Sequence, residues 1–596
     1  MTRSLLALLC AMLSLICEAR QGKLEKSSGQ SGANATAALD IDHQFDAGSG
    51  IKAPEKLSKG QIENLATLGR VWGFLKYHHP KVTAGQTQWD YELFRIMPQI
   101  LAATDRATAN AALVKWVTSL GPVAPCKRCV GPDTDDISLR SDVAWIGDKQ
   151  LLGDVLSQCL QMIYANRVAD QQFYVSGAPA GNPILDEELA YEHLKFPDAG
   201  FQLLALYRYW NIIEYWYPYR DVIGGDWSAA LTEFVPRMAL AKDSETYQRQ
   251  LIALVAKVHD GHASLSSSLY PPVGNCRLPI NVLFVENFPV ISQISTTAEK
   301  DRTELEIGDV ITSFDNVPIN KLIEGWAPYY GASNEPFKLF FIGQFMTKGE
   351  CGESSVGVRR GNKEVTLKVT RVASENLKAP THDLPGPTFR LLSKDVAYLK
   401  LSSIKAGDAP KYVEQAGGTK GMIIDIRNYP SEFVVFALGS LLVNVETPFA
   451  RFTKCDFSNP GTFHWTSPIS LTPEEPHYSG KIAILVDERS ISQAEYTAMA
   501  FRAAHGAIVV GSSTAGADGN VSFVPLPGGL RSTISGIGVF YPNKEPTQRV
   551  GIRPDVHIEP TIAGIRAGRD EILEEALRQI LGTSVPSTVI ENMAKP

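Results

Sequence analysis

The chain has 596 residues, of which 44% are hydrophobic and 20% are charged, and its formal net charge is -7 at pH 7. Because that length exceeds what one hydrophobic core organises, we expect three or four domains. The mild negative charge, without a dense stripe of lysine and arginine, argues against nucleic acid or an anionic membrane as a partner.

The first residues predict an export signal. Arg3 precedes an apolar run from Leu5 to Cys17, and a small-x-small cleavage site ends at Ala19. We therefore expect residues 1–19 to be a signal peptide that directs the chain to a periplasm or the extracellular space. The run is too short to span a membrane, and no later stretch is long and apolar enough. A lipoprotein anchor fits poorly, because the large residues Leu15 and Ile16 directly precede Cys17. Residues 20–54, rich in serine, glycine, alanine and lysine, predict a disordered linker.

The N-terminal third contains an internal repeat. RVWGFLKYHHP at 70–80 recurs as RYWNIIEYWYP at 208–218, and further tryptophan, leucine and proline residues recur at the same separation. Apolar residues at i, i+3 and i+4 predict a pair of helices in each copy, joined at a proline-containing turn. We expect a helical domain over 55–200 and a second helical repeat over 201–275 that leads into the next part. The aromatic stripe is then a packing face rather than a ligand site.

Six cysteines follow the signal, and Cys126 and Cys129 have the spacing of a zinc knuckle. No second pair of cysteines or histidines completes four ligands. In an exported protein this spacing predicts a local disulfide.

Short β-type runs occupy residues 276–375. Within them, ELEIGDVITSFDNVPI at 304–319 resembles the Gly-Asp strand of PDZ domains. A PDZ domain adds a peptide as a strand to the edge of its sheet and often captures the peptide's C-terminal carboxylate. Residues 321–349 predict a helical insertion in this domain.

Strands and helices alternate over 385–590, which predicts an α/β core with a partly parallel, buried sheet. KIAILV at 481–486 predicts a buried strand, and a helix is expected to begin near Ile491 or Ser492. Free amide N–H groups in a first helical turn can stabilise an oxyanion beside Ser492. Ser492 and Glu495 also fit the S-x-x-E capping box, which is the purely structural alternative.

Several pieces in a fixed order resemble the C-terminal processing (tail-specific) proteases and their tricorn-core relatives over roughly residues 250–580. They are Asp260-Gly261-His262, the PDZ-like segment, IIDIRNYP (423–430), SQAE (492–495), VVGSSTAG (509–516) and VGIRPDV (550–556). The resemblance implies a crotonase- or Clp-like ββα protease core with an inserted PDZ-like domain. It also implies peptide-bond hydrolysis without a metal or organic cofactor. It makes Ser492 the nucleophile and leaves Ser490 to cap or turn the chain.

The resemblance favours the tricorn-like branch. Ala517 stands where the processing proteases carry a lysine base, and no lysine occurs between Lys481 and Lys544. His262 stands where the tricorn-like branch carries its histidine, and the unperturbed pKa of histidine suits a general base near neutral pH. His259 is a weaker candidate because it precedes the Asp-Gly turn.

The remaining site residues depart from that pattern. Gln548 stands where the branch has a glutamate, so it can form hydrogen bonds but carries no charge. The group that orients His262 stays open at this point, with Asp518 as one candidate. The oxyanion hole is expected to use the amides of Gln493 and Ser431, because Pro430 has no N–H.

We therefore expect an exported serine-type peptidase that acts on polypeptides, with its PDZ-like domain placed to read a substrate's C-terminus. The alternative is a catalytically decayed peptide- or apolar-ligand-binding protein on the same fold, supported by Gln548 and by Ser431-Glu432. An esterase or lipase fits less well, because no G-x-S-x-G elbow surrounds Ser492.

Overall fold

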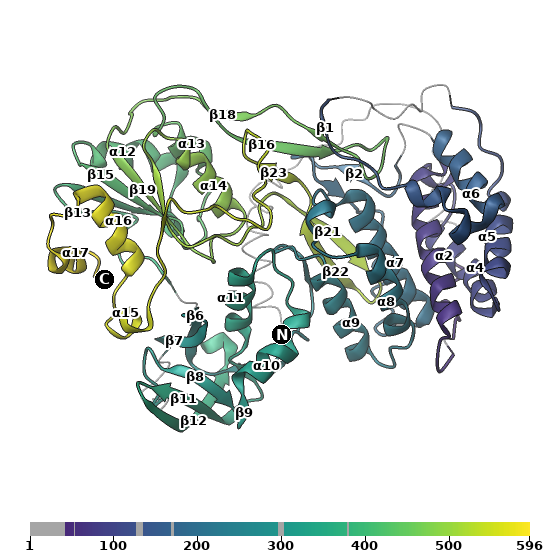
Figure 1. Ribbon diagram of the computed structural model, residues 1–596, viewed down its shortest axis with the longest axis horizontal. Helices are drawn as coiled ribbons and strands as arrows, with labels where there is room; N and C mark the ends of the chain where they lie inside the picture. The colour runs from purple at the N-terminus through teal and green to yellow at the C-terminus, as the bar shows by residue number, and fades with distance from the viewer. Residues whose placement is uncertain are drawn as a thin grey trace.

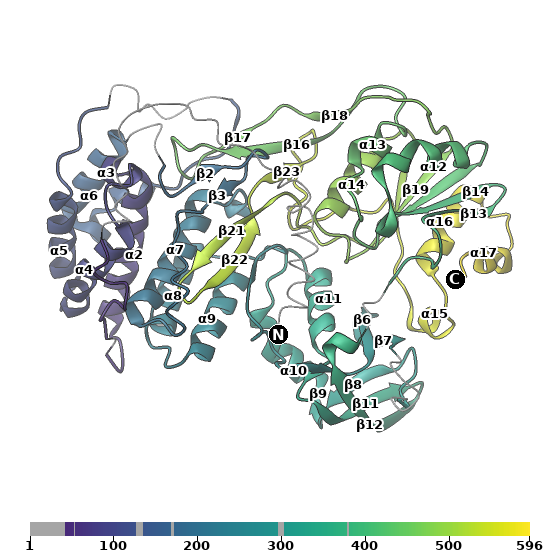
Figure 2. The same cartoon turned by 180° about the vertical axis from the view of Figure 1, so that it is seen from behind.

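A computed structural model describes residues 42–52, 54–126, 135–167, 172–295, 303–377 and 381–595. Helices α2 to α9 form one end of the molecule, an α/β core forms the other, and a β-rich region lies between and below them (Figures 1 and 2). The predicted signal peptide and most of the predicted linker lie outside the described residues. Within these ranges, no helix has the length and apolar character needed to cross a membrane.

The helical part, residues 55–275, contains two segments with the same internal contacts. Its main helices are α2 (Lys59–His78), α3 (Pro80–Thr83), α4 (Trp89–Ala102), α5 (Arg106–Ser119), α6 (Lys149–Ala165), α7 (Ala199–Trp216), α8 (Trp227–Ala239) and α9 (Ser244–Ala256). Trp72 and Trp89 each donate an indole N–H to the other's carbonyl, at 3.1 and 3.0 Å. Trp210 and Trp227 do the same at 2.8 and 3.1 Å. The recurring tryptophans therefore join α2 to α4 and α7 to α8 in the same way.

A buried group of four charged side chains links these two segments. Arg208 pairs with Asp90 at 2.5 Å and with Glu188 at 2.8 Å, and Lys76 pairs with Glu188 at 2.7 Å. Two cations balance two carboxylates, and none of the four side chains is more than 3% exposed. Removing one partner would leave an uncompensated buried charge, which typically costs about 3–5 kcal/mol.

The β-rich region, residues 276–375, is called the β domain below. Its sheet has the order β10-β5-β12-β11-β8-β7-β6. The strands are β5 (Cys276–Arg277), β6 (Ile280–Val285), β7 (Phe288–Ile294), β8 (Val310–Phe314), β10 (Lys348–Gly349), β11 (Gly352–Arg360) and β12 (Lys363–Ala373), with β9 (Val317–Pro318) beside β8. Helices α10 (Ile319–Trp326) and α11 (Glu335–Phe345) fall within the predicted helical insertion, except that α10 begins two residues earlier.

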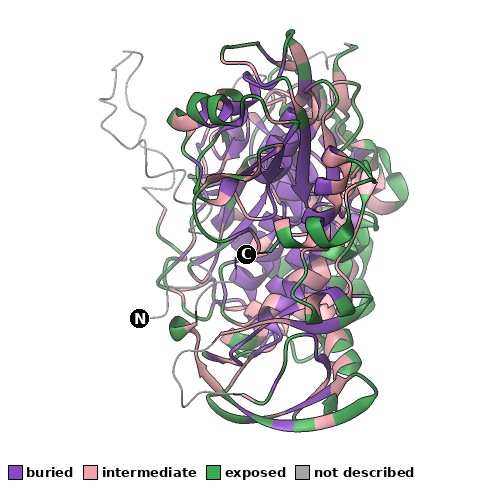
Figure 3. Cartoon of the chain, turned by 90° about the vertical axis from the view of Figure 1, so that its left-hand side faces the viewer, coloured by how far each residue is buried: buried purple, intermediate pink, exposed green. Residues whose placement is uncertain are grey.

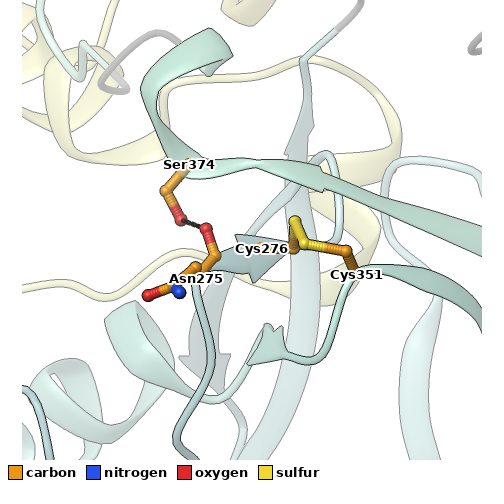
Figure 4. Close-up of a disulfide and its surroundings, with 4 residues drawn as sticks. All are labelled: Asn275, Cys276, Cys351 and Ser374. Carbon is orange, nitrogen blue, oxygen red and sulfur yellow. Dashed lines mark hydrogen bonds between the residues drawn. A yellow bond between two sulfur atoms is a disulfide. The ribbon is translucent and has the colours of Figure 1, made fainter. Parts of the chain in front are cut away.

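A disulfide between Cys276 and Cys351 closes this domain at the end of its sheet (Figure 4). Next to it, the Ser374 hydroxyl donates to the Asn275 carbonyl at 3.1 Å. Cys126 is also disulfide-bonded, whereas Cys129 lies outside the described residues.

The core sheet, residues 385–590, has the strand order β13-β14-β15-β19-β20-β24. The last five strands are parallel: β14 (Val396–Lys400), β15 (Gly421–Asp425), β19 (Lys481–Val486), β20 (Ile508–Gly511) and β24 (Val556–His557). The first, β13 (Phe389–Ser393), runs antiparallel to β14. β19 coincides with the predicted KIAILV strand.

Helices cover both faces of this sheet, which explains its continuous apolar strands. Alternate residues such as Ile424 and Ile484 pack with α13 (Val435–Gly439) and α14 (Gln493–Arg502). Their neighbours Ile423 and Leu485 pack against α16 (Glu571–Leu581) on the other face. Figure 3 shows the sheet as the buried centre of this end of the molecule.

A hairpin from late in the chain crosses from the core to the helical part (Figures 1 and 2). Its strands are β21 (Val521–Leu526) and β22 (Leu530–Ser535), and β22 pairs with β4 (Ser264–Leu265), which follows α9. The register opposes Thr533 to Ser264. Residues 262–265 and 532–535, distant in sequence, are thereby held side by side.

Candidate active site

Ser492 is the N-cap of α14 and follows the loop that leaves β19. Its φ and ψ are 59° and −123°, a strained combination for a residue with a side chain. Its amide donates to the Ala517 carbonyl at 2.9 Å. Ser490 is fully buried and its hydroxyl donates to the Ile426 carbonyl at 3.0 Å, so it joins two strand ends. Of the two serines, Ser492 has the backbone geometry of a presented nucleophile.

Glu495 fixes the loop around Ser492. Its carboxylate accepts N–H groups from Ser492 at 3.2 Å, Gly516 at 2.8 Å and Ala517 at 2.9 Å, together with the Thr514 hydroxyl. Burial raises its pKa to about 7, and these hydrogen bonds oppose that shift. The role of Glu495 is therefore to hold the first turn of α14 against residues 514–517.

His262 is buried and is oriented by Ser535 and Asp260. Its Nδ1 lies 2.9 Å from Ser535 Oγ, which lies 2.9 Å from an oxygen of Asp260. The Asp260 carboxylate also accepts the amides of His262 at 3.0 Å and Ser535 at 2.7 Å. Burial lowers the pKa of His262, and the charge of Asp260 opposes that shift.

The hydrogen bonds among His262, Ser535 and Asp260 determine which ring nitrogen of His262 carries the proton. A carboxylate only accepts, so the Ser535 hydroxyl donates to Asp260. Ser535 Oγ must then accept from His262, which places the proton on Nδ1. Nε2 is left with a free lone pair, and it is buried without a hydrogen-bond partner in the described part of the chain. His262 is thus held in the tautomer that a general base requires.

The loops carrying His262 and Ser492 meet at Ala517. A side-chain carbon placed on Gly261 would come within 2.8 Å of the Ala517 Cβ, and the Ala517 carbonyl accepts from the Ser492 amide. This close approach leaves no room for a side chain at the residue before His262.

Residues just before α11, in the insertion of the β domain, hold both loops. Ser333 Oγ accepts the Gly261 amide at 2.8 Å, and Asn334 Nδ2 donates to the Thr514 carbonyl at 2.7 Å. Phe337 packs with Ala515 in a small apolar cluster. The β domain therefore takes part directly in assembling the site.

The amides predicted for the oxyanion hole differ in their availability. The Ser431 amide donates to the Leu401 carbonyl at 2.9 Å, so the prediction for Ser431 is wrong for this conformation. The phenol of Tyr429 lies near the Gln493 amide and the Ser492 hydroxyl. Of the predicted pair, Gln493 is the residue that directly follows Ser492 in the first turn of α14.

Gln548 and Asp518 do not contact the histidine ring. Gln548 Nε2 donates to Asp260 at 3.2 Å and to Ser333 at 3.4 Å. One oxygen of Asp518 accepts the Gly519 amide, and the other is buried without a partner in the described residues. His259 Nδ1 donates to the Ile223 carbonyl instead, at 2.7 Å. Gln548, predicted as an uncharged, hydrogen-bonding member of the site, therefore bonds to Asp260 rather than to His262. Among the described residues, no three His, Cys, Asp or Glu side chains are grouped to hold a metal ion.

Sequence reasoning missed Ser535 and the role of Asp260. The hairpin that brings Ser535 to His262 was not predicted, although Pro527-Gly528-Gly529 separates two β-type runs and is a turn signal. Asp260 was noted only as part of the Asp-Gly-His segment.

Residues 395–558 match the family model described as Peptidase family S41. Mature CPAF complexed with lactacystin is 14% identical over 62% of this chain and 95% of its own, with a TM-score of 0.50. A mutant of CPAF is 15% identical over 62% of this chain and 94% of its own, with a TM-score of 0.51. The photosystem II D1 C-terminal processing protease is 14% identical over 65% and 98%, with a TM-score of 0.39. No curated protein matches the sequence.

The two CPAF structures show a shared fold, and the family match lies on the core strands from β14 to β24. The family match supports a peptidase, and the serine type is consistent with this family.

Proposed function

We propose that the protein is an exported serine peptidase in which Ser492 is the nucleophile and His262 the general base. One observation carries this proposal: the chain from Asp260 through Ser535 to His262 leaves Nε2 as a free, buried proton acceptor. The strained backbone of Ser492 supports the nucleophile assignment. The family match over the core supports the reaction class.

In the proposed reaction, Ser492 Oγ attacks the scissile carbonyl and its proton passes to His262 Nε2. The Gln493 amide stabilises the oxyanion that forms. His262 then gives the proton to the leaving amine, and water hydrolyses the acyl-enzyme by the same transfers in reverse order. Asp260 stabilises the imidazolium through Ser535. Catalytic hydrogen bonds often form only when substrate binds, so a hydrogen bond from Ser492 Oγ to His262 Nε2 is expected to form in the complex.

Export is supported by the predicted signal segment and by the disulfide of the β domain, since disulfides persist in oxidising compartments. The resemblance of the β domain to PDZ domains supports a role in holding a polypeptide, and its contacts through Ser333 and Asn334 place it against the proposed catalytic loops. The alternative, a catalytically decayed binding protein, was supported by Gln548 and by Ser431-Glu432; the Asp260 carboxylate beside His262 weakens the first of these supports.

The test is cleavage of a mixed peptide library by the purified protein, with new termini identified by mass spectrometry. Wild type is expected to generate new termini. Ser492→Ala should generate none, whereas Ser513→Ala, a change at a nearby serine outside the proposed site, should cleave as wild type does. Cleavage by Ser492→Ala, or none by folded wild type, would contradict the proposal.

A further inference from the structure

Five aromatic rings form a connected surface beside the first turn of α14, called the aromatic surface below. Tyr496 lies at its centre, 5.2 Å from Phe449, 5.7 Å from Phe452 and 6.3 Å from Phe433 between ring centroids. Phe436 completes it, 6.0 Å from Phe433 and 6.1 Å from Phe449. These spacings are those of interacting aromatic pairs.

The outer rings of this surface face solvent. Phe433 is 51% exposed and Phe436 is 42% exposed, while Phe449 beneath them is only 2% exposed. Single exposed apolar residues are common, but adjacent exposed rings resting on buried ones typically mark a binding surface. α13, which contains Phe436, lies beside α14 on one face of the core sheet (Figures 1 and 2).

The aromatic surface begins at Ser492. Tyr496 is four residues after Ser492, on the same side of α14, and its amide donates to the Ser492 carbonyl at 3.0 Å. The Gln493 side chain donates to the Glu432 carbonyl at 2.9 Å and thereby ties the residue before Phe433 to the same helical turn. A polypeptide whose carbonyl lies at Ser492 would therefore extend a nearby side chain over these rings.

We propose that the aromatic surface is the subsite that receives a large apolar, preferably aromatic, side chain within two residues of the scissile bond. This inference rests on the proposed peptidase function and adds the substrate class to it. Phe433 and Phe436 supply stacking area for a ring, and burying an apolar side chain against them contributes a discrimination of about 1–3 kcal/mol, or about 10–200-fold, over a small side chain.

The test compares two peptides that differ only by phenylalanine or alanine at the position found to dominate library cleavage. Wild type is expected to show a kcat/KM about 10–200-fold higher for the phenylalanine peptide. The Phe433→Ser, Phe436→Ser double variant should lose most of that preference. Phe288→Ser, which removes a 44% exposed ring from the β domain, should keep the full preference.

Equal kcat/KM values for the two peptides in wild type, or an unchanged preference in the double variant, would overturn the subsite while leaving the peptidase standing. Loss of a homodimer in the double variant, measured by analytical ultracentrifugation, would reassign the surface to a second copy of the chain. If wild type cleaves no peptide, the peptidase proposal fails, and the binding to Ser492→Ala of two otherwise identical peptides with phenylalanine or alanine at one central position still decides the subsite. Tighter binding of the phenylalanine peptide is expected there, and equal affinities would overturn it.

Discussion

Ser535→Ala removes the hydroxyl between His262 and Asp260 while leaving the Ser535 amide bonded to Asp260. In the transition state His262 is an imidazolium, so the lost contact is a hydrogen bond to a charged group, worth about 1.5–3 kcal/mol. At about 1.4 kcal/mol per tenfold change, kcat should fall by about 10–150-fold. KM should change little, because the Ser535 hydroxyl bonds to His262 and Asp260 and is expected to act through the histidine rather than on the substrate.

The measurement is steady-state cleavage of one library-derived peptide across pH, with thermal unfolding measured in parallel. The matched control is Ser532→Ala on the same strand, which removes a buried hydrogen bond from the Ser532 hydroxyl to the Ser264 carbonyl at 2.9 Å. It should cost stability but retain kcat and the pH profile. A Ser535→Ala enzyme with wild-type kcat, or one whose loss is matched by Ser532→Ala, would refute the assignment of Ser535 as a positioning residue.

Other substitutions test the same site. Asp260→Asn should lower kcat by roughly 10³–10⁴-fold, as expected when the tautomer is lost. Because the charge of Asp260 raises the pKa of His262, the acidic limb of kcat/KM should also move to lower pH, and a limb that stays or rises would contradict this. Gln548→Glu places a second carboxylate against Asp260, which raises the pKa of one of the two carboxyl groups. The variant should therefore lose stability at pH 8 and regain it as pH falls. A melting temperature equal to wild type at pH 8 would contradict the contact between residue 548 and Asp260. The free energy of unfolding of Ser492→Gly should be about 1 kcal/mol higher than that of Ser492→Ala, because glycine adopts a positive φ without strain. Equal denaturation curves for the two variants would argue against backbone strain at this residue. Ser333→Ala should lower kcat more than it raises KM, because it releases the Gly261 amide from its hydrogen bond. A larger effect on KM than on kcat in peptide cleavage would exclude a positioning role for Ser333.

Local patterns in the sequence were enough to predict the strand and the helix on either side of Ser492, the proposed nucleophile. The apolar run at 481–486 is β19, and Ser492 is the N-cap of the helix that follows. These features depend on neighbouring residues alone, since a buried strand and a capping box are each determined by residues a few positions apart.

The orientation of His262 depends instead on pairing across the fold. Ser535 reaches His262 only because β22 pairs with β4, and the register of that pairing cannot be predicted from either segment alone. The Ser431 amide was predicted to be free, but its partner at Leu401 lies 30 residues earlier and is brought there by the fold. The missing charge at Gln548 pointed to decay, whereas Asp260 supplies it from beside the histidine.

Covalent labelling is the sharpest test of whether Ser492 is activated through His262. Folded wild-type protein is treated with a fluorophosphonate, digested, and mapped by mass spectrometry. We expect one adduct, on Ser492, whose rate of formation falls sharply in His262→Ala. An adduct on another serine, or an undiminished rate on Ser492 without His262, would contradict it.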